Sequence, residues 1–221
     1  MTQIQWNAVD DYITDLLVPP DPALDAVLQS TIDANLPKIN VAPNQGKLLH
    51  MLAQIRSARR ILELGTLAGY STIWLARALP ADGKLITLEA NPKHAEVARK
   101  NIDRAELSNI VEIRVGAALD TLPQLTDEAP FDFVFIDADK ANTPDYFTWA
   151  LKLTQRGSII IVDNVIRNGA VINDDSTDEN IQGIRKFNRL LAAEPRVKAT
   201  AIQTVGSKGY DGLAIALVIS D

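Results

Sequence analysis

Three oxygen-bearing side chains follow two apolar runs in the second half of the chain. The run at 131–136 leads directly into Asp137, and the run at 158–162 leads into Asp163 and Asn164. If both runs are neighbouring parallel strands, their carboxyl ends meet at one edge of the sheet. Two carboxylates and an amide oxygen are hard ligands that suit Mg²⁺, Ca²⁺ or Mn²⁺. We therefore predict a divalent-cation site, against the alternative that Asp139 and Asn164 only cap helices.

A glycine-containing segment at 63–71 predicts a second site. Gly65 and Gly69 would let the backbone approach a ligand closely, and the helix that follows offers free N–H groups. The glycines are four residues apart, which is not the G-x-G-x-x-G spacing of dinucleotide-binding proteins. Glu63 would repel a pyrophosphate but could accept hydrogen bonds from an ammonium group, directly or through water. The alternative is a tight strand-to-helix turn without a ligand.

Glu89 ends the next apolar run, at 85–88, and is placed to accept hydrogen bonds from both hydroxyls of a ribose. The alternative is a cap for the helix that begins at Pro92, although Asn91 fills that role better. The glycine segment and Glu89 together predict an adenosine-type ligand.

These residues require an alternation of strands and helices to position them. Short apolar runs predict strands at 61–64, 85–88, 110–115, 131–136 and 158–162, and helical patterns lie between them at 70–79, 92–106, 117–125 and 143–154. Buried strands alternating with helices predict a parallel sheet with right-handed crossovers. A last helix at about 178–193 precedes strands at 197–204 and 212–219, which the turn at 206–209 joins into an antiparallel hairpin at a sheet edge.

The first part of the chain reads as helical. Helical spacing covers 6–17, 22–35 and 43–57, with Pro19 and Pro20 ending the first of these segments. We find no interdomain linker, so an N-terminal helical arm (1–38) belongs to the same domain as the rest (39–221). The predicted fold class is α/β: a Rossmann-like, doubly wound, mostly parallel seven-stranded sheet with an antiparallel C-terminal hairpin.

Composition narrows the choice of partners. The 221 residues include 22 Lys and Arg against 28 Asp and Glu, a formal net charge of −6, which argues against binding to nucleic acid or anionic membranes. No cysteine is present, which excludes disulfides and thiolate metal sites and suits a cytoplasmic location. No signal peptide or membrane-spanning stretch is predicted. His50 and His94 are expected to be ordinary helix residues.

Three motifs resemble one known family. They are Glu-Leu-Gly-x-x-x-Gly-Tyr-Ser at 63–71, Phe-Ile-Asp-Ala-Asp-Lys at 135–140 and Val-Asp-Asn-Val at 162–165. In combination they are similar to the cation-dependent class I O-methyltransferases, which use S-adenosylmethionine (SAM) and release S-adenosylhomocysteine (SAH). The nearest branch is the caffeoyl-CoA O-methyltransferase-like group with its bacterial members, related more distantly to catechol O-methyltransferase. The resemblance covers about residues 39–221.

The resemblance implies a role for each matching position. The residues that it places at the methionine end of SAM are Glu63, Gly65, Thr66 and Ser71. Those that it places elsewhere along SAM are Val41, Glu89 at the ribose, Ala118 against the adenine, and Asp139 and Tyr146 on the cofactor side. It implies that Asp137, Asp163 and Asn164 are the metal ligands, with Mg²⁺ expected first, and that Lys140 is the general base. It also implies that Asp137, Lys140 and Asn168 contact the substrate.

The resemblance predicts an O-methyltransferase that acts on a catechol-like or other vicinal-hydroxyl phenol, and it suggests a homodimer. The plant enzymes carry Trp where this chain has Arg167, so the plant substrate is not carried over. Two alternatives remain: a nicotinamide-dependent dehydrogenase on the same fold, which the glycine spacing disfavours, and a non-catalytic homologue that only binds the cofactor.

Overall fold

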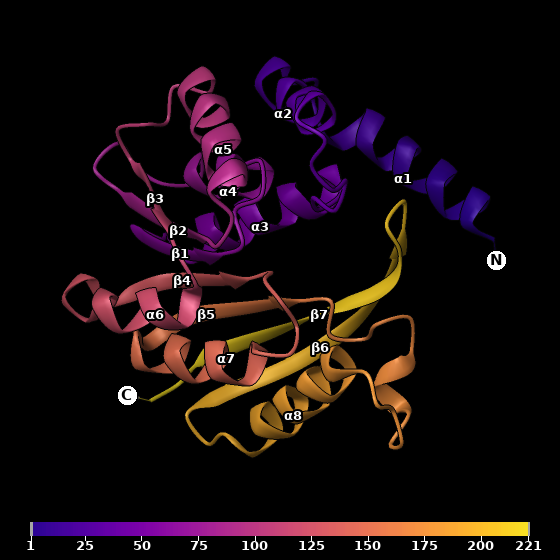
Figure 1. Ribbon diagram of the computed structural model, residues 1–221, viewed down its shortest axis with the longest axis vertical. Coiled ribbons are helices and arrows are strands. Elements are labelled where there is room, and N and C mark those ends of the chain that lie inside the picture. Colours follow the sequence, from indigo (N-terminus) through magenta and orange to yellow (C-terminus); the bar gives the residue numbers. More distant parts are fainter. Residues whose placement is uncertain (1, 221) are drawn as a thin grey trace.

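The centre of the molecule is one seven-stranded sheet with the order β3-β2-β1-β4-β5-β7-β6 (Figure 1). The structure is a computed structural model that describes residues 2–220. Residue 1, in the predicted segment 1–38, and residue 221, in the predicted segment 39–221, lie outside the described residues. The first five strands are parallel, and β7 runs antiparallel to both β5 and β6. The strands are β1 (Arg60–Leu64), β2 (Lys84–Glu89), β3 (Val111–Val115), β4 (Phe131–Ile136), β5 (Thr154–Asp163), β6 (Val197–Gly206) and β7 (Gly209–Val218). The predicted fold class is confirmed.

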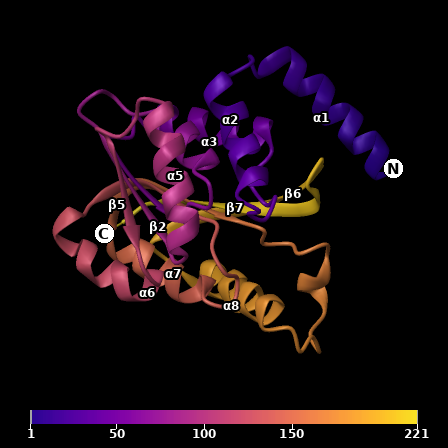
Figure 2. The same ribbon diagram turned by 45° about the horizontal axis from the view of Figure 1, so that its top comes forward.

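Helices cover both faces of the sheet (Figures 1 and 2). One face carries α2 (Pro22–Asp33), α3 (Pro43–Ile55), α4 (Tyr70–Ala76) and α5 (Pro92–Arg104). The other carries α6 (Ala118–Thr121), α7 (Thr143–Lys152) and α8 (Glu179–Ala193), with the 3₁₀ helices η1 (Leu122–Glu128) and η2 (Ala170–Ile172) in the connections on that side.

The central strands β1, β2 and β4 are mostly apolar because both of their faces are buried. Leu62 and Leu64 of β1 pack in the core on the α6–α8 side, while Ile61 packs in the core on the α2–α5 side. Glu63 points to the same side as Ile61, by the alternation along a strand, and is fully buried there. A carboxylate in this position costs folding free energy unless it has hydrogen-bond partners, so it stands out as a functional residue.

The strand order indicates where a ligand crevice should lie. β1 lies between β2 and β4, and the chain leaves β1 towards β2 but returns on its other side as β4. Ligands in doubly wound folds bind at such a switch point, outside the carboxyl ends of the strands. The loops after β1 and β4, which carry residues 65–69 and 137–142, are therefore neighbours at this edge.

One predicted element differs from the sequence expectation. The helix expected at 117–125 is a four-residue α6 followed by the 3₁₀ helix η1. Pro123 lies at the second position of η1, and a proline has no N–H to donate to the preceding turn. The α-helix therefore ends at Thr121, and the chain continues as the more tightly wound 3₁₀ helix.

The N-terminal arm lies against the hairpin made by β6 and β7. In both views α1 (Gln3–Leu17) lies outside the sheet layers, close to the hairpin tip (Figures 1 and 2). Gln3 Nε2 donates to the Gly206 carbonyl at 2.8 Å, and Asp10 Oδ2 accepts from the Ser207 N–H at 2.7 Å. Within residues 2–220, none of the helices is long and apolar enough to cross a bilayer.

Candidate active site

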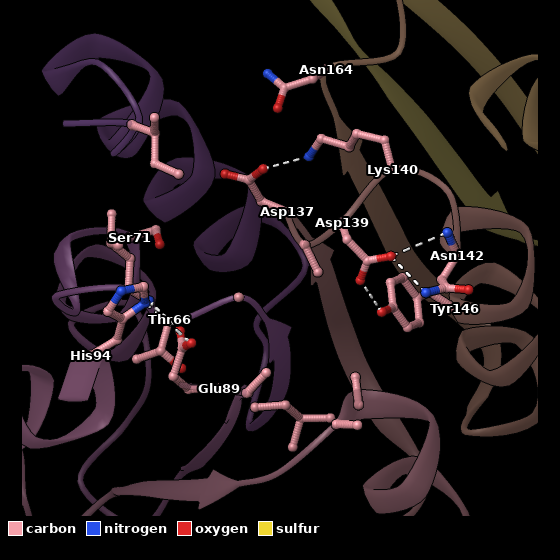
Figure 3. A pocket seen from close by; sticks show the side chains of 18 of the residues that line it. Thr66, Ser71, Glu89, His94, Asp137, Asp139, Lys140, Asn142, Tyr146 and Asn164 are labelled. Atoms are coloured by element: carbon pink, nitrogen blue, oxygen red, sulfur yellow. Dashed lines mark hydrogen bonds and ion pairs between the residues drawn. The ribbon is translucent and has the colours of Figure 1, made fainter. Parts of the chain in front are cut away.

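A cavity of about 680 Å³ opens at the carboxyl ends of the parallel strands (Figure 3). Its walls come from the loops that follow β1, β2, β3 and β4 and from the segment before α3. The predicted cofactor residues that line it are Val41, Gly65, Thr66, Ser71, Glu89, Ala118, Asp139 and Tyr146. The structure thus brings together all of the predicted cofactor residues except Glu63.

Gly65 makes the close approach of two loops possible. Its φ is +99°, a conformation that favours glycine, and a Cβ built on it would lie 2.1 Å from the Asp137 carbonyl oxygen. Gly69, with φ of +89°, is the N-cap of α4. The loop after β1 therefore lies directly on the chain that carries Asp137, so the two halves of the site are in contact.

Glu63 lies beneath the cavity rather than on its wall. Its carboxylate accepts hydrogen bonds from Ser71 Oγ at 2.6 Å, Thr72 Oγ1 at 2.5 Å and Thr87 Oγ1 at 2.7 Å. Full burial raises the pKa of Glu63 from 4.5 to about 7, although these three donors act in the opposite direction. Ser71 connects this carboxylate to the cavity, because it contacts Glu63 and also lines the cavity wall.

Glu89 is held by backbone donors, as a ribose-binding acid would need to be. Its Oε2 accepts from the Leu67 N–H at 2.8 Å, and its Oε1 accepts from the Asn91 N–H at 2.9 Å. A carboxylate has about four acceptor positions, so further hydroxyl donors can still bind it. His94 Nδ1 lies 3.3 Å from Glu89 Oε1, and His94 lines the cavity. His94 lies in α5, as expected of a helix residue, but it has a partner in Glu89.

Asp139, Asn142 and Tyr146 form a hydrogen-bonded group on the opposite wall (Figure 3). Asp139 Oδ2 accepts from Asn142 Nδ2 at 2.6 Å, and Asp139 Oδ1 accepts from the Tyr146 hydroxyl. Burial and the charge of Asp139 raise the pKa of Tyr146, so its hydroxyl stays a donor. Ala118 and Leu119 add a small apolar surface to the cavity lining.

The predicted metal ligands and Lys140 stand at the ends of β4 and β5. Lys140 Nζ donates to Asp137 Oδ1 at 2.7 Å (Figure 3). Asp163 is buried; its Oδ2 accepts from Gln45 Nε2 at 2.8 Å and its Oδ1 accepts from the Asn164 N–H at 2.8 Å. Burial raises the pKa of Asp163 most, and the negative charge of Asp137 raises it further. The second effect shows that the two carboxylates lie near enough to repel each other.

A second cavity, of about 490 Å³, adjoins the first. Residues of α1, of the segment 38–48, of the loop 163–168 and of the β6–β7 hairpin line it. Asp163 and Asn168 face this second cavity, whereas Asn164 and Val41 line both. The predicted metal ligands therefore stand at the boundary between two spaces, one with the predicted cofactor residues and one with the predicted substrate contact Asn168.

Comparison with known proteins agrees with this geometry. The profile of a family described as O-methyltransferase matches residues 18–218. The chain belongs to this O-methyltransferase family. The match confirms the resemblance stated from the motifs and the expectation of an enzyme of this class, and it stands against a dehydrogenase.

Individual relatives are similar over their whole length. A catechol O-methyltransferase of Niastella koreensis is 56% identical over 215 residues, which cover 96% of this chain and 97% of that protein. An O-methyltransferase from Bacillus cereus, solved in complex with SAH, superposes with a TM-score of 0.97 at 58% identity, covering 98% of this chain and all of that one. The O-methyltransferase TomG from Streptomyces achromogenes, involved in tomaymycin synthesis and solved with SAM, also has a TM-score of 0.97, at 51% identity and with both chains fully covered.

The site residues that were not predicted include His94, Asn142 and Gln45. His94 lies in the first turn of α5, five residues after Glu89. This short spacing from the predicted ribose-binding acid could have indicated that His94 lies near the ligand. Asn142, three residues after Asp139, could have been found in the same way. Gln45 gave no signal, because it contacts Asp163 across 118 positions of sequence.

Proposed function

We propose that this protein is a divalent-cation-dependent enzyme that transfers the methyl group of SAM to a hydroxyl of a catechol-like or other vicinal-hydroxyl phenol. The observation that carries the proposal is the position of Asp137, Asp163 and Asn164 between the two cavities. A methyl donor in the larger space and a phenol in the smaller one would meet there. The catechol O-methyltransferase of Niastella koreensis and the SAH and SAM complexes of the two solved relatives support the same assignment.

The residues present fit a divalent cation. The candidate set is the two carboxylates and one amide of Asp137, Asp163 and Asn164; among residues 2–220 there is no group of three or more His, Cys, Asp or Glu side chains arranged to hold a metal. This oxygen-only set suits Mg²⁺, Ca²⁺ or Mn²⁺, with positions left for water and substrate. Burial, and then the charge of Asp137, raise the pKa of Asp163, and a bound dication would offset both the burial of this carboxylate and its repulsion from Asp137.

We assign the wall residues to parts of SAM. Ser71, Thr66 and Gly65, with Glu63 behind Ser71, would hold the amino-acid end, since a buried carboxylate favours a nearby ammonium group. Glu89 would accept the ribose hydroxyls, and Ala118 would lie against the adenine. Asp139, Tyr146 and Val41 would complete the enclosure, and Lys140, which lines the same cavity, would lie between the donor and the acceptor.

The chemistry transfers a methyl cation equivalent. The sulfur–carbon bond of SAM breaks, an oxygen–carbon bond forms on the phenol, and SAH leaves as a neutral thioether. A bound dication would make the acceptor hydroxyl more acidic. Lys140 would take the hydroxyl proton as general base and return it to solvent, and its hydrogen bond with Asp137 fixes its position. Asn168 would contact the acceptor in the second cavity. The rest of the rate gain comes from orientation of two bound molecules.

The test is a methyl-transfer assay with SAM and a small panel of catechols, with and without EDTA. We expect methoxy product and SAH only when a divalent cation is present. Asp163→Asn, which keeps the shape of a buried side chain, should lose the cation-stimulated activity, whereas the exposed Asp127→Asn should keep it. Undiminished activity in EDTA would contradict the cation assignment, and no transfer to any catechol would contradict the function.

We also propose a cytoplasmic homodimer. Apolar side chains of α1 are exposed at Ile4, Val9, Tyr12 and Leu16, next to the exposed edge strand β6. An exposed apolar patch usually marks an interface, and we propose that these side chains form one. Light scattering after gel filtration should give twice the mass of the chain, and Leu16→Glu should lower the mass to that of one chain. A single-chain mass for the unmodified protein would contradict the dimer.

A further inference from the structure

The segment 164–169, which follows β5, has an unusual backbone. Positive φ angles occur at Asn164 (+59°), Arg167 (+54°), Asn168 (+54°) and Gly169 (+81°). Residues with a Cβ rarely adopt this left-handed conformation, and they keep it only where the surrounding structure holds them there. The segment carries two residues of the proposed site, Asn164 at the cation and Asn168 at the acceptor. The contacts that hold the segment therefore also bear on the site.

The start of β7 holds the segment. Asp211 Oδ1 accepts hydrogen bonds from the backbone N–H groups of Ile166 at 3.0 Å and Arg167 at 2.9 Å. The same oxygen accepts from the N–H of Gly212 at 2.9 Å, and the Gly212 carbonyl accepts from the Val165 N–H at 3.0 Å. The side chain of Asp211 is only 20% exposed. One shielded carboxylate oxygen is thus the acceptor for two successive N–H groups of the segment.

Gly212 allows the hairpin to approach the segment this closely. A Cβ built on Gly212 would lie 2.5 Å from Ile166 Cγ1 and 2.3 Å from the Ile202 carbonyl oxygen. The next residue, Leu213, pairs with Asp163 of β5, so this contact lies directly beside the strand end that carries the proposed cation ligands. The glycine leaves room for the segment, and the adjacent carboxylate accepts its N–H groups.

Asp211 acts on the chain rather than on a cation. Its Oδ1 already has three N–H donors, whereas a carboxylate oxygen has about two lone pairs. Its Oδ2 faces Arg167, whose Nη1 lies 3.9 Å away. Hydrogen bonds to a charged acceptor are about twice as strong as those between neutral groups. The carboxylate can therefore hold a backbone conformation that is unfavourable by itself.

We infer that Asp211 is a positioning residue for the proposed reaction. It fixes the segment 164–169 so that Asn164 reaches the cation and Asn168 reaches the acceptor. The inference rests on the proposed function, which gives these two asparagines their roles. It goes beyond that function by assigning a role to a residue of the hairpin that lies in none of the three sequence motifs.

The test separates the acceptor oxygen of Asp211 from its charge. Mn²⁺ is titrated into the protein in the presence of SAH, and the free ion is followed by electron paramagnetic resonance. Asp211→Ala should lower the affinity for Mn²⁺ by about 10–100-fold, the range for loss of a group that orients a metal ligand. Asp211→Asn keeps an acceptor oxygen without the charge and should retain most of the affinity. Asp211→Glu keeps the charge but displaces it by one carbon, and it should lose affinity as Asp211→Ala does.

Two further measurements distinguish positioning from a general loss of stability. The KM for catechol should rise in Asp211→Ala and Asp211→Glu, while SAH affinity in calorimetry stays nearly unchanged, because the loops after β1, β2, β3 and β4 supply most of the larger cavity. Asp132→Ala is the matched control. Asp132 Oδ2 accepts from the N–H groups of Arg59 at 2.8 Å and Arg60 at 3.0 Å near the amino end of β4, opposite the site. Its loss should lower the free energy of unfolding and leave Mn²⁺ affinity and the catechol KM unchanged.

The outcomes separate the two proposals. Unchanged Mn²⁺ affinity in Asp211→Ala and Asp211→Glu would overturn the positioning role and leave the proposed function standing. So would equal losses in Asp211→Asn and Asp211→Ala, because the charge alone would then explain them, and so would an equal loss in Asp132→Ala. If Asp211→Ala no longer binds SAH, the comparison of Asp211→Asn with Asp211→Glu decides in its place. No saturable Mn²⁺ binding to the unmodified protein would instead contradict the cation site of the proposed function, and the inference with it.

Discussion

Replacement of Glu63 by Gln should stabilise the ligand-free protein at alkaline pH. Glu63 is fully buried, and burial raises its pKa from 4.5 to about 7. The folded protein therefore binds more protons than the unfolded chain between these two values, so stability falls as the pH rises through this window. The rise in pKa corresponds to about 3 kcal/mol of destabilisation once the pH exceeds both values. Gln is neutral at every pH and does not carry this cost.

The measurement is urea unfolding of the protein without ligand at pH 5 and pH 8. Relative to the unmodified protein, the free energy of unfolding of Glu63→Gln should improve by about 2–3 kcal/mol between the two pH values, because only part of the cost is present at pH 5. Glu106→Gln, at an exposed position, is the control and should show no such change. A Glu63→Gln variant whose relative stability is the same at both pH values would refute the reasoning.

The same variant should lose affinity for SAM. The Glu63 carboxylate contacts Ser71 on the cavity wall, and its negative charge favours the cationic end of SAM. If Glu63→Gln is more stable but binds SAM less tightly, then Glu63 contributes to cofactor binding and lowers the stability of the fold. Equal SAM affinity in calorimetry at pH 8 would remove Glu63 from the cofactor site.

Two further predictions concern Lys140. Lys140→Ala should lower kcat by roughly 10²–10⁴, as for loss of a general base, while SAH affinity in calorimetry stays nearly unchanged; an equal loss of both would argue against the base. Gly183→Ala on α8 should lower the free energy of unfolding by about 1–3 kcal/mol and also lower kcat, because its Cβ would lie 2.3 Å from the Lys140 carbonyl oxygen and would displace that loop. Lys186→Ala, exposed on the same helix, is the control for urea unfolding and kinetics, and a Gly183→Ala variant equal to it would contradict this packing argument.

Much of the fold could be predicted because burial on both faces leaves a simple pattern. The runs at 61–64 and 131–136 are apolar except for Glu63 and Asp132, since the other side chains meet a core on one face or the other. Parallel strands then bring their carboxyl ends together, which predicts the meeting of Asp137 and Asp163 without coordinates. The prediction of one α-helix at 117–125 was wrong for a local reason, which is Pro123. Whether a proline ends an α-helix or is followed by a 3₁₀ helix depends on the turn around it.

Contacts between segments that are distant along the chain could not be predicted from the sequence. Asp10 meets the hairpin at Ser207 across 197 positions, and nothing in the pattern of α1 indicates that it helps to line the second cavity. Gln45 reaches Asp163 in the same way. Glu63 was expected at the cofactor, yet its side chain follows the strand alternation into the core and reaches the cavity through Ser71 rather than directly.

Binding of Mn²⁺ tests the central claim most directly, because it reports on the cation site without requiring turnover. Mn²⁺ is titrated into the protein in the presence of SAH and catechol, and the free ion is followed by electron paramagnetic resonance. We expect saturable binding of one ion per chain, and loss of this binding in the Asp137→Asn, Asp163→Asn double variant. Binding that the double variant retains, or no saturable binding in the unmodified protein, would contradict the claim.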